Sequence, residues 1–251
     1  MRTRPRDEKR MAFLEHLEEL RWRILKSLAA VIIASIVAYI FSSHLLNLLI
    51  RPVPPDVQLI FTAPAGAFLI RIKISLIFGL LGGVPVLFYQ AWKFIFPGLF
   101  DSEIKLVSVV VLSGTVCFLL GAAFALFIIL PLGLRFLFSF QTAQLMPMPD
   151  INNYVGFAGR LFLAFGVVFE LPLLSFILSK MGILTPSFLR RQRRYAIVVI
   201  FIAAAILTPP DVITQVLLAA PLILLYEISV WISAAVSREQ QDKKQDTIEK
   251  E

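Results

Sequence analysis

The fold class is decided by the run Leu161-Phe162-Leu163-Ala164-Phe165-Gly166-Val167-Val168-Phe169-Glu170-Leu171-Pro172-Leu173-Leu174. The nearest charges on either side are Arg160 and Lys180, so a helix here carries one carboxyl group, that of Glu170, at its centre. At about 1.5 Å per residue, this group lies about 15 Å from either end, near the middle of a hydrocarbon core roughly 30 Å thick. Carboxyl groups at that depth are rare and usually face a bundle interior or a water-filled path. The run therefore predicts an integral membrane protein that keeps a polar feature within the lipid.

The composition agrees with a membrane protein. Hydrophobic residues make up 58% of the 251 residues and charged residues 16%, against about 45–50% and about 25% in soluble domains. With one cysteine, Cys117, and two histidines, we expect no internal disulfide, no metal site and no cofactor. The first apolar run, 24–41, is too long for the apolar region of a secretory signal and lacks a clear cleavage site, so we expect it to be retained.

Six uncharged stretches predict six membrane crossings, at about 24–43, 74–92, 106–130, 161–179, 195–207 and 212–236. We expect an all-α integral membrane protein, with residues 1–236 forming one six-helix bundle in which helices 5 and 6 are short. A charged tail, 237–251, is expected to lack regular structure.

The fifth stretch would reach only about 20 Å as a helix. One possibility is that the bilayer is thinned there or that a partner covers this edge of the protein. The other is that the helix extends through Arg190–Arg194, whose side chains would then reach toward water. The pair Pro209-Pro210 predicts a tight turn between the fifth and sixth helices, and it argues against one long helix over 195–236.

The positions of basic residues predict the orientation. If the N-terminus is inside, the inner segments hold 19 of the 24 Lys and Arg residues, so the positive-inside rule predicts that both termini are inside. The net charge of +7 then reflects topology and anionic lipids, and we expect no binding of nucleic acid. The outer connections, 44–73 and 131–160, are expected to form ordered, cap-like loops, with Asp150 capping the helix that leads into the fourth crossing.

Acidic side chains stand among the basic residues of the predicted inner face. Residues 13–23 have apolar positions at helical spacing, and their other face carries Glu15, Glu18 and Glu19. The simplest interpretation is local pairing, of Glu19 with Arg23 and of Glu18 with Arg21. In the first inner loop, Asp101 or Ser102 is a candidate cap for the third crossing, and Glu103 lies in its first turn.

Four motifs in this order resemble the TatC family, the receptor subunit of the twin-arginine protein translocase. They are His16-Leu17-Glu18-Glu19-Leu20-Arg21, Phe94 with Pro97-Gly98-Leu99 and Glu103, Phe169-Glu170-Leu171-Pro172, and Thr208-Pro209-Pro210-Asp211. The resemblance covers about residues 13–236. It implies a non-enzymatic receptor of the bacterial cytoplasmic (inner) membrane, which binds twin-arginine signal peptides of folded cargo proteins and uses the proton-motive force to export that cargo. Its implied partners are TatA-type and TatB-type single-span subunits, other copies of itself and the lipid bilayer.

The resemblance also implies site residues. Glu19 and Glu103 would accept the two arginines of the signal peptide, with Arg21 and Phe94 beside them. A carboxylate can meet a guanidinium with two parallel hydrogen bonds, which a lysine cannot match. Thr208 and Gln215 would offer polar contacts to the single-span partners, or they cap the turn at Pro209-Pro210.

Glu170 and Glu227 are the two carboxyl groups within apolar runs, and each has more than one interpretation. The resemblance places Glu170 on a concave polar face open to lipid. The alternatives are a protonated carboxyl bonded to a carbonyl freed by Pro172 and a proton relay. Glu227 either pairs with another helix or reaches inner water. The alternative function is a proton-coupled small-solute transporter that uses both groups. An intramembrane protease is disfavoured because the predicted topology separates His16 from His44 and embeds no pair of aspartates.

Overall fold

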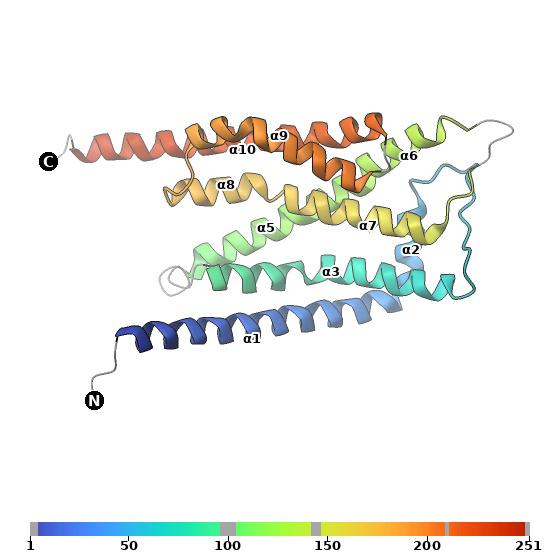
Figure 1. The fold of residues 1–251 in the computed structure, drawn as a ribbon, viewed down its shortest axis with the longest axis horizontal. Coiled ribbons are helices and arrows are strands. Elements are labelled where there is room, and N and C mark those ends of the chain that lie inside the picture. The colour runs from blue at the N-terminus through green and yellow to red at the C-terminus, as the bar shows by residue number, and fades with distance from the viewer. Residues whose placement is uncertain (1–4, 96–103, 142–146, 209–210, 249–251) are drawn as a thin grey trace. The chain divides into compact units, whose positions relative to one another are not determined.

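The computed structural model describes residues 5–95, 104–141, 147–208 and 211–248, and the side chains of 15–95, 108–141, 147–208 and 211–240. The helices are α1 (Pro5–Ile40), α2 (Ser42–Ile50), α3 (Gly66–Ile95), α5 (Ile104–Phe124), the π-helix η1 (Ala125–Ile129), α6 (Leu130–Phe138), α7 (Ile151–Val168), α8 (Leu171–Lys180), α9 (Pro186–Leu207) and α10 (Val212–Ile248) (Figure 1). Residue contacts divide the chain into two units. The first comprises Met1–Leu46 and Arg71–Thr115, and the second Asn47–Ile70 and Val116–Glu251.

The chain is an all-helical, multi-pass membrane protein. Five segments of the described chain are long and apolar enough to cross a bilayer: Glu15–Ile40, Gly66–Ile95, Ser108–Phe138, Ile151–Lys180 and Val212–Gln240. Apolar side chains also lie on the surface, as on α1, where Ile33 and Ile40 are 63% and 73% exposed. Lipid favours such exposure and water opposes it. α9 contains the stretch predicted as the fifth crossing, but its first half carries four arginines.

In the first unit, α1 and α3 lie side by side (Figure 1). A Cβ atom added to Gly79 of α3 would lie 2.1 Å from Ser35 Oγ and 2.5 Å from Ser35 Cα, so glycine allows the two helices to approach closely at this level. Ile74 and Val84 of α3 are buried at 0% and 2% exposure. The predicted interfacial helix and the first crossing form one continuous helix, α1, since no glycine or proline interrupts 6–40.

In the second unit, α10 packs along both α8 and α9, as Figure 1 shows. Buried serines join α8 to α10: Ser175 Oγ donates to the Ser229 carbonyl over 2.8 Å, and Ser179 Oγ lies 2.7 Å from Ser233 Oγ. The core of this unit includes fully buried apolar side chains of α6, α7 and α10, namely Leu130, Leu161, Phe162, Phe165 and Leu222. Burial of these side chains stabilises the unit against separation of its helices.

Asp150 is the N-cap of α7, as predicted. Its Oδ1 accepts from the backbone N–H groups of Asn152 and Asn153 at 2.9 and 3.1 Å, and its Oδ2 accepts from Thr62 Oγ1 at 2.9 Å. An isolated parallel β-bridge pairs Ile60 with Asp150. The loop before α3 is therefore tied to the start of α7.

Two helical runs differ from the sequence-based expectation. The fourth run is divided at Phe169–Glu170 into α7 and α8, because Pro172 lies in the first turn of α8 and cannot donate a backbone hydrogen bond into a continuous helix. The last helix, α10, continues to Ile248 through the charged segment after residue 236. That segment contains no glycine or proline and is rich in Glu, Gln and Lys, which are good helix formers.

Candidate functional site

One face of α1 turns toward α3 and carries the predicted acceptor Glu19. Glu19 lies one turn before Arg23, whose guanidinium contacts Gln90 of α3. The contact of Gly79 with Ser35 and that of Gly83, whose added Cβ would lie 3.0 Å from Val31 Cγ2, show that α1 also packs on α3 further along the helix.

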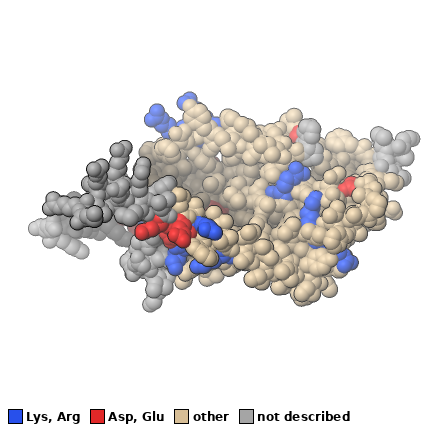
Figure 2. Space-filling view, turned by 60° about the horizontal axis from the view of Figure 1, so that its bottom comes forward, with Lys and Arg blue, Asp and Glu red and all other residues tan. Residues whose placement is uncertain are grey.

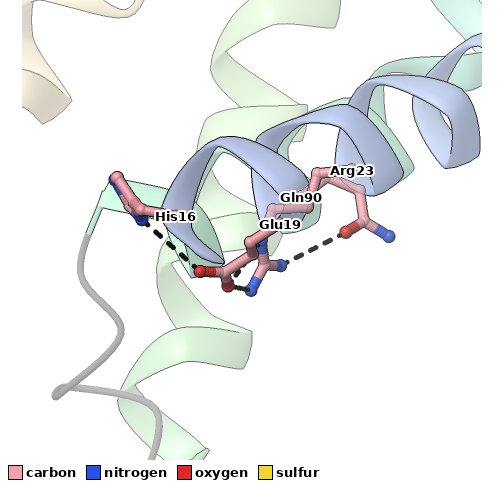
Figure 3. Close-up of polar contacts among 4 residues, drawn as sticks. All are labelled: His16, Glu19, Arg23 and Gln90. Atoms are coloured by element: carbon pink, nitrogen blue, oxygen red, sulfur yellow. Dashed lines mark hydrogen bonds and ion pairs between the residues drawn. The ribbon is translucent and has the colours of Figure 1, made fainter. Parts of the chain in front are cut away.

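The Glu19 carboxylate is already occupied by a guanidinium of its own helix (Figure 3). Arg23 Nε donates to Glu19 Oε1 over 3.0 Å, and Arg23 Nη2 donates to the same oxygen. Arg23 Nη1 donates to Gln90 Oε1 on α3 over 3.4 Å, and His16 Nδ1 lies 3.5 Å from Glu19 Oε2. The Glu19 side chain is 37% exposed and that of Arg23 12% exposed. The carboxylate thus binds a guanidinium while one side of it stays open.

Phe94, near the end of α3, lies beside the same cluster. Its ring stacks on the His16 imidazole with centroids 4.4 Å apart and planes 8° from parallel. This stack fixes the imidazole that contacts Glu19 and joins α1 to the last turn of α3.

A groove between α1 and α3 begins at this cluster. It has a volume of about 510 Å³, and its walls are mainly apolar, including Ile24 and Leu28 of α1 and Leu87 of α3. Arg23 and Gln90 also line it, so a polar end adjoins an apolar channel. Such a groove suits the apolar side chains of a chain segment whose polar end lies beside Arg23 and Gln90.

Other acidic residues accompany Glu19. Glu15 and Glu18 are exposed on the same helix, and so is Arg21. Figure 2 shows several Asp and Glu side chains gathered in one patch with Lys and Arg beside them. Glu103, the second predicted acceptor, lies outside the described residues.

Glu170 lies in the second unit, at the junction of α7 and α8. It is 5% exposed, and its Oε1 atom has no hydrogen-bond partner within the described part of the chain. The backbone of Phe118 is the polar group beside the carboxyl. Gly121 lets α5 approach α7 here, since an added Cβ would lie 2.4 Å from the Phe165 carbonyl oxygen. An incompletely bonded carboxyl in this position is costly to keep in apolar surroundings.

The other predicted polar residues all bond to their own chain. Glu227 Oε2 accepts from Arg193 Nη2 over 2.6 Å, which links α10 to α9. Thr208 Oγ1 donates to the Ala204 carbonyl and Gln215 Nε2 to the Phe201 carbonyl, each over 2.9 Å. Thr208 thus bonds to the last turn of α9, and Gln215 joins α10 to α9. Nowhere in the described ranges do His, Cys, Asp and Glu side chains cluster in a way that would hold a metal ion.

Comparison with known proteins assigns the chain to a family. The profile described as "Sec-independent protein translocase protein (TatC)" matches residues 15–221. The chain belongs to the TatC family. The match begins four residues before Glu19 and ends within α10.

Relatives with the same description are similar over most of their length. The TatC protein of Desulforapulum autotrophicum is 40% identical over 241 residues, which cover 94% of this chain and 89% of the relative. That of Aquifex aeolicus is 40% identical over 237 residues, covering 92% and 98%, and that of Escherichia coli K12 is 36% identical over 224 residues, covering 88% and 87%. A crystal structure of the twin arginine translocase receptor TatC superimposes with a TM-score of 0.81 at 40% identity, over 88% of this chain and 99% of that one.

TatC proteins are translocase components and not enzymes, so the family assignment confirms the resemblance and replaces the alternative of a small-solute transporter. Two contacts of the Glu19 cluster escaped the sequence analysis: the hydrogen bond from Arg23 to Gln90 and the stack of His16 on Phe94. Both join α1 to α3, and no periodicity within either helix indicates which residues face each other across the pair.

Proposed function

We propose that this TatC protein is the receptor of a twin-arginine translocase and binds the arginine pair of a signal peptide at the Glu19 site. Glu103 would be the second acceptor, with Arg21 and Phe94 beside the pair. The observation that carries the proposal is the Glu19–Arg23 contact at the polar end of an apolar groove. One oxygen of this carboxylate, Oε1, accepts from two N–H groups of one guanidinium, and lysine has no such fixed fork of donors.

Binding would proceed by exchange of one guanidinium for another. An incoming arginine approaches the open side of Glu19, and Arg23 turns from the carboxylate to Gln90, to which it already donates. Because one guanidinium replaces another at the carboxylate, the net gain in binding energy is small, and the exchange supplies selectivity. The apolar segment of the signal peptide, lying along Ile24, Leu28 and Leu87 in the groove, supplies most of the affinity.

The proposed topology has six crossings, with both termini on the cytoplasmic side of the bacterial inner membrane. α9 supplies the short fifth crossing, in which its apolar half spans a thinned bilayer and its arginines reach the inner interface. Replacing the only cysteine, Cys117, by alanine provides a background for accessibility labelling. An impermeant thiol reagent applied to intact cells should label a cysteine at position 56 and spare one at position 187.

The single-span TatA-type and TatB-type subunits would dock on α9 and α10. An apolar stripe on α9 is exposed: Val199, Ile202 and Ile206 are 62%, 56% and 71% exposed. Thr208 and Gln215 hold the two helices in the arrangement that presents this stripe. Glu170, with an oxygen that lacks a partner among the described residues, would lie on a polar face within the membrane.

The decisive experiment measures binding of a fluorescent twin-arginine peptide to the purified protein. We expect Glu19→Ala to weaken binding about tenfold or more, because a charge-assisted pair of hydrogen bonds is lost. Glu18→Ala is the matched control, since it removes the same charge from the neighbouring exposed position and should leave binding unchanged. A peptide with two lysines should bind the native protein no better than it binds the Glu19→Ala variant.

Equal binding of the twin-arginine peptide by the native protein and by Glu19→Ala would exclude this site. Equal loss in Glu18→Ala would show that general negative charge, and not the geometry of Glu19, attracts the peptide. Glu103→Ala extends the test to the second proposed acceptor.

A further inference from the structure

A second groove lies in the other unit, between the start of α9 and the last described side chains of α10. Its volume is about 670 Å³. The polar residues that line it are Thr185, Ser187, Arg190, Ser237, Arg238 and Gln240. We call it the α9–α10 groove. None of these residues takes part in the Glu19 site, which belongs to the first unit.

The groove brings together two guanidinium groups from two helices. Arg190 and Arg238 are both exposed, and neither forms an ion pair with any acidic side chain that the structure describes. Elsewhere on α9 the pattern differs, since Arg193 is paired with Glu227. Two cations that share one recess and lack a carboxylate partner form a site for an anion with several oxygen acceptors.

Hydroxyl groups complete the donor set. Thr185 Oγ1 accepts from the Phe188 backbone N–H over 3.3 Å and lies 3.1 Å from Ser187 Oγ, so the first turn of α9 is capped and ordered. Ser237 contributes a third hydroxyl from α10. Gln240 Nε2 donates to the Lys180 carbonyl over 2.7 Å, which holds α10 against the end of α8. Guanidinium and hydroxyl donors in this number suit the oxygens of a phosphate group.

The position of the groove, at the ends of two membrane-spanning segments, indicates which kind of phosphate would reach it. Two of the candidate spans end beside it, at Lys180 and at Gln240. Apolar side chains near it are exposed: Ile183 at 65%, Phe188 at 51% and Trp231 at 66%. Trp231 precedes Arg238 by two helical turns and shares its face of α10. A tryptophan and an arginine exposed on the same face of a helix, two turns apart, are typical of the interface between hydrocarbon and headgroups.

We propose that the α9–α10 groove binds the phosphate of an anionic phospholipid headgroup, with the acyl chains lying along the apolar surface near Phe188 and Trp231. Basic recesses between membrane helices suit anionic headgroups. A dissolved anion would use the arginines but not the apolar rim. The bound lipid bridges α9 to α10 at the level where α9 is most strongly basic, and so it stabilises this helix pair.

The test uses the full-length purified protein in detergent and phosphatidylglycerol as the probe, with phosphatidylcholine for comparison. Native mass spectrometry counts bound lipid, and thermal unfolding measures stabilisation. We expect the double variant Arg190→Gln/Arg238→Gln to bind phosphatidylglycerol about tenfold more weakly and to lose its stabilisation by that lipid. The control Arg191→Gln/Arg194→Gln also removes two positive charges, from positions of α9 outside the groove. It should retain both phosphatidylglycerol binding and stabilisation by that lipid.

A variant that leaves the charge unchanged distinguishes a specific groove from a general effect of charge, and its circular dichroism spectrum shows whether the protein is folded. Ser187→Leu narrows the groove at an exposed position and should also weaken phosphatidylglycerol binding, while the circular dichroism spectrum stays native. Equal loss in both double variants would show diffuse attraction and overturn the proposal. Displacement of the lipid by inorganic phosphate at millimolar concentration would identify a site for free anions and would equally overturn it.

Discussion

Arg23 lies on the carboxylate of Glu19, with Nε 3.0 Å from Oε1, and reaches Gln90 Oε1 with its Nη1 atom at 3.4 Å. An i,i+4 pair on a helix is usually a local feature of small energetic weight. Here the pair stands at the mouth of an apolar groove and is joined to a second helix through Gln90. The native protein therefore places its own guanidinium, that of Arg23, on the carboxylate to which the arginine of the proposed ligand would bind.

Removing this internal guanidinium should strengthen binding of a twin-arginine peptide. We expect Arg23→Gln to raise the affinity about twofold to fivefold, because the incoming arginine no longer competes with the internal guanidinium for the carboxylate of Glu19. Fluorescence anisotropy with a labelled peptide measures the change. Lys26→Gln is the control, since it removes an exposed cation of the same helix that is absent from the groove lining. Weaker binding by Arg23→Gln would show that Arg23 positions Glu19 and does not compete for it.

Close packing of α1 on α3 should be essential to the site. In Gly79→Ala the new methyl group would lie 2.1 Å from Ser35 Oγ and 2.5 Å from the backbone Cα of Ser35, so the helices must separate. We expect a loss of about 1–3 kcal/mol in stability and weaker peptide binding, because Glu19 and Gln90 move apart. Thermal unfolding in detergent and peptide anisotropy give the two readouts.

Gly82→Ala provides the matched control for this packing argument. Its added Cβ would lie 3.6 Å from Ala34 Cβ, an ordinary contact distance, so both stability and binding should remain native. If Gly79→Ala were as stable as Gly82→Ala, the helices would have room to adjust, and close approach at Ser35 would not be needed for the site.

Much of the architecture follows from features that are local in the sequence. Uncharged runs predict the membrane helices, the i,i+4 spacing predicts the contact of Glu19 with Arg23, and the preference of aspartate for helix N-termini predicts Asp150 as the cap of α7. Each of these depends on residues fewer than about five positions apart, or on an average over a run.

The contacts that complete the Glu19 site are not local, and for that reason the sequence did not indicate them. The stack of His16 on Phe94 and the bond from Arg23 to Gln90 depend on the register of α1 against α3. Gly79 marks that register in the structure, but the sequence does not say which residue it meets. The break at Glu170 was likewise missed, although Pro172 contained the signal.

The Asp150 cap should make stability depend on pH in one direction. Hydrogen bonds from the Asn153 backbone and from Thr62 hold the pKa of this carboxyl below its ordinary value of 3.8. A lowered pKa means that the ionised carboxyl stabilises the fold at any pH above 3.8, and that this stabilisation is lost as the pH falls through the lowered value. Asp150→Asn should therefore lower the unfolding temperature by a similar amount from pH 7 to about pH 4, and the difference should shrink below.

Thermal unfolding of both proteins across this pH range measures the effect. Asp56→Asn serves as the control in the same loop region, because Asp56 accepts a hydrogen bond from Gln141 and caps no described helix, so its replacement should change the unfolding temperature less. A difference between Asp150→Asn and the native protein that grows toward acid pH would mean that the carboxyl is protonated more easily in the folded state, contrary to its hydrogen bonding.

The buried contact of Ser179 with Ser233 should behave as a coupled pair. Their Oγ atoms are 2.7 Å apart, and the two residues are 1% and 0% exposed. Replacing either serine by alanine leaves the other hydroxyl with its interhelical partner removed, at a cost of about 1 kcal/mol. The double variant Ser179→Ala/Ser233→Ala should be no less stable than either single variant, because no orphaned hydroxyl remains.

Thermal or denaturant unfolding of the four proteins gives the coupling energy directly. Ser113→Ala is the control, because Ser113 donates to carbonyls of its own helix, and its replacement should change stability by only a few tenths of a kcal/mol. Strictly additive losses at positions 179 and 233 would mean that each hydroxyl finds another acceptor, such as a carbonyl of its own helix. In that case the packing of α8 on α10 would depend on van der Waals contact alone.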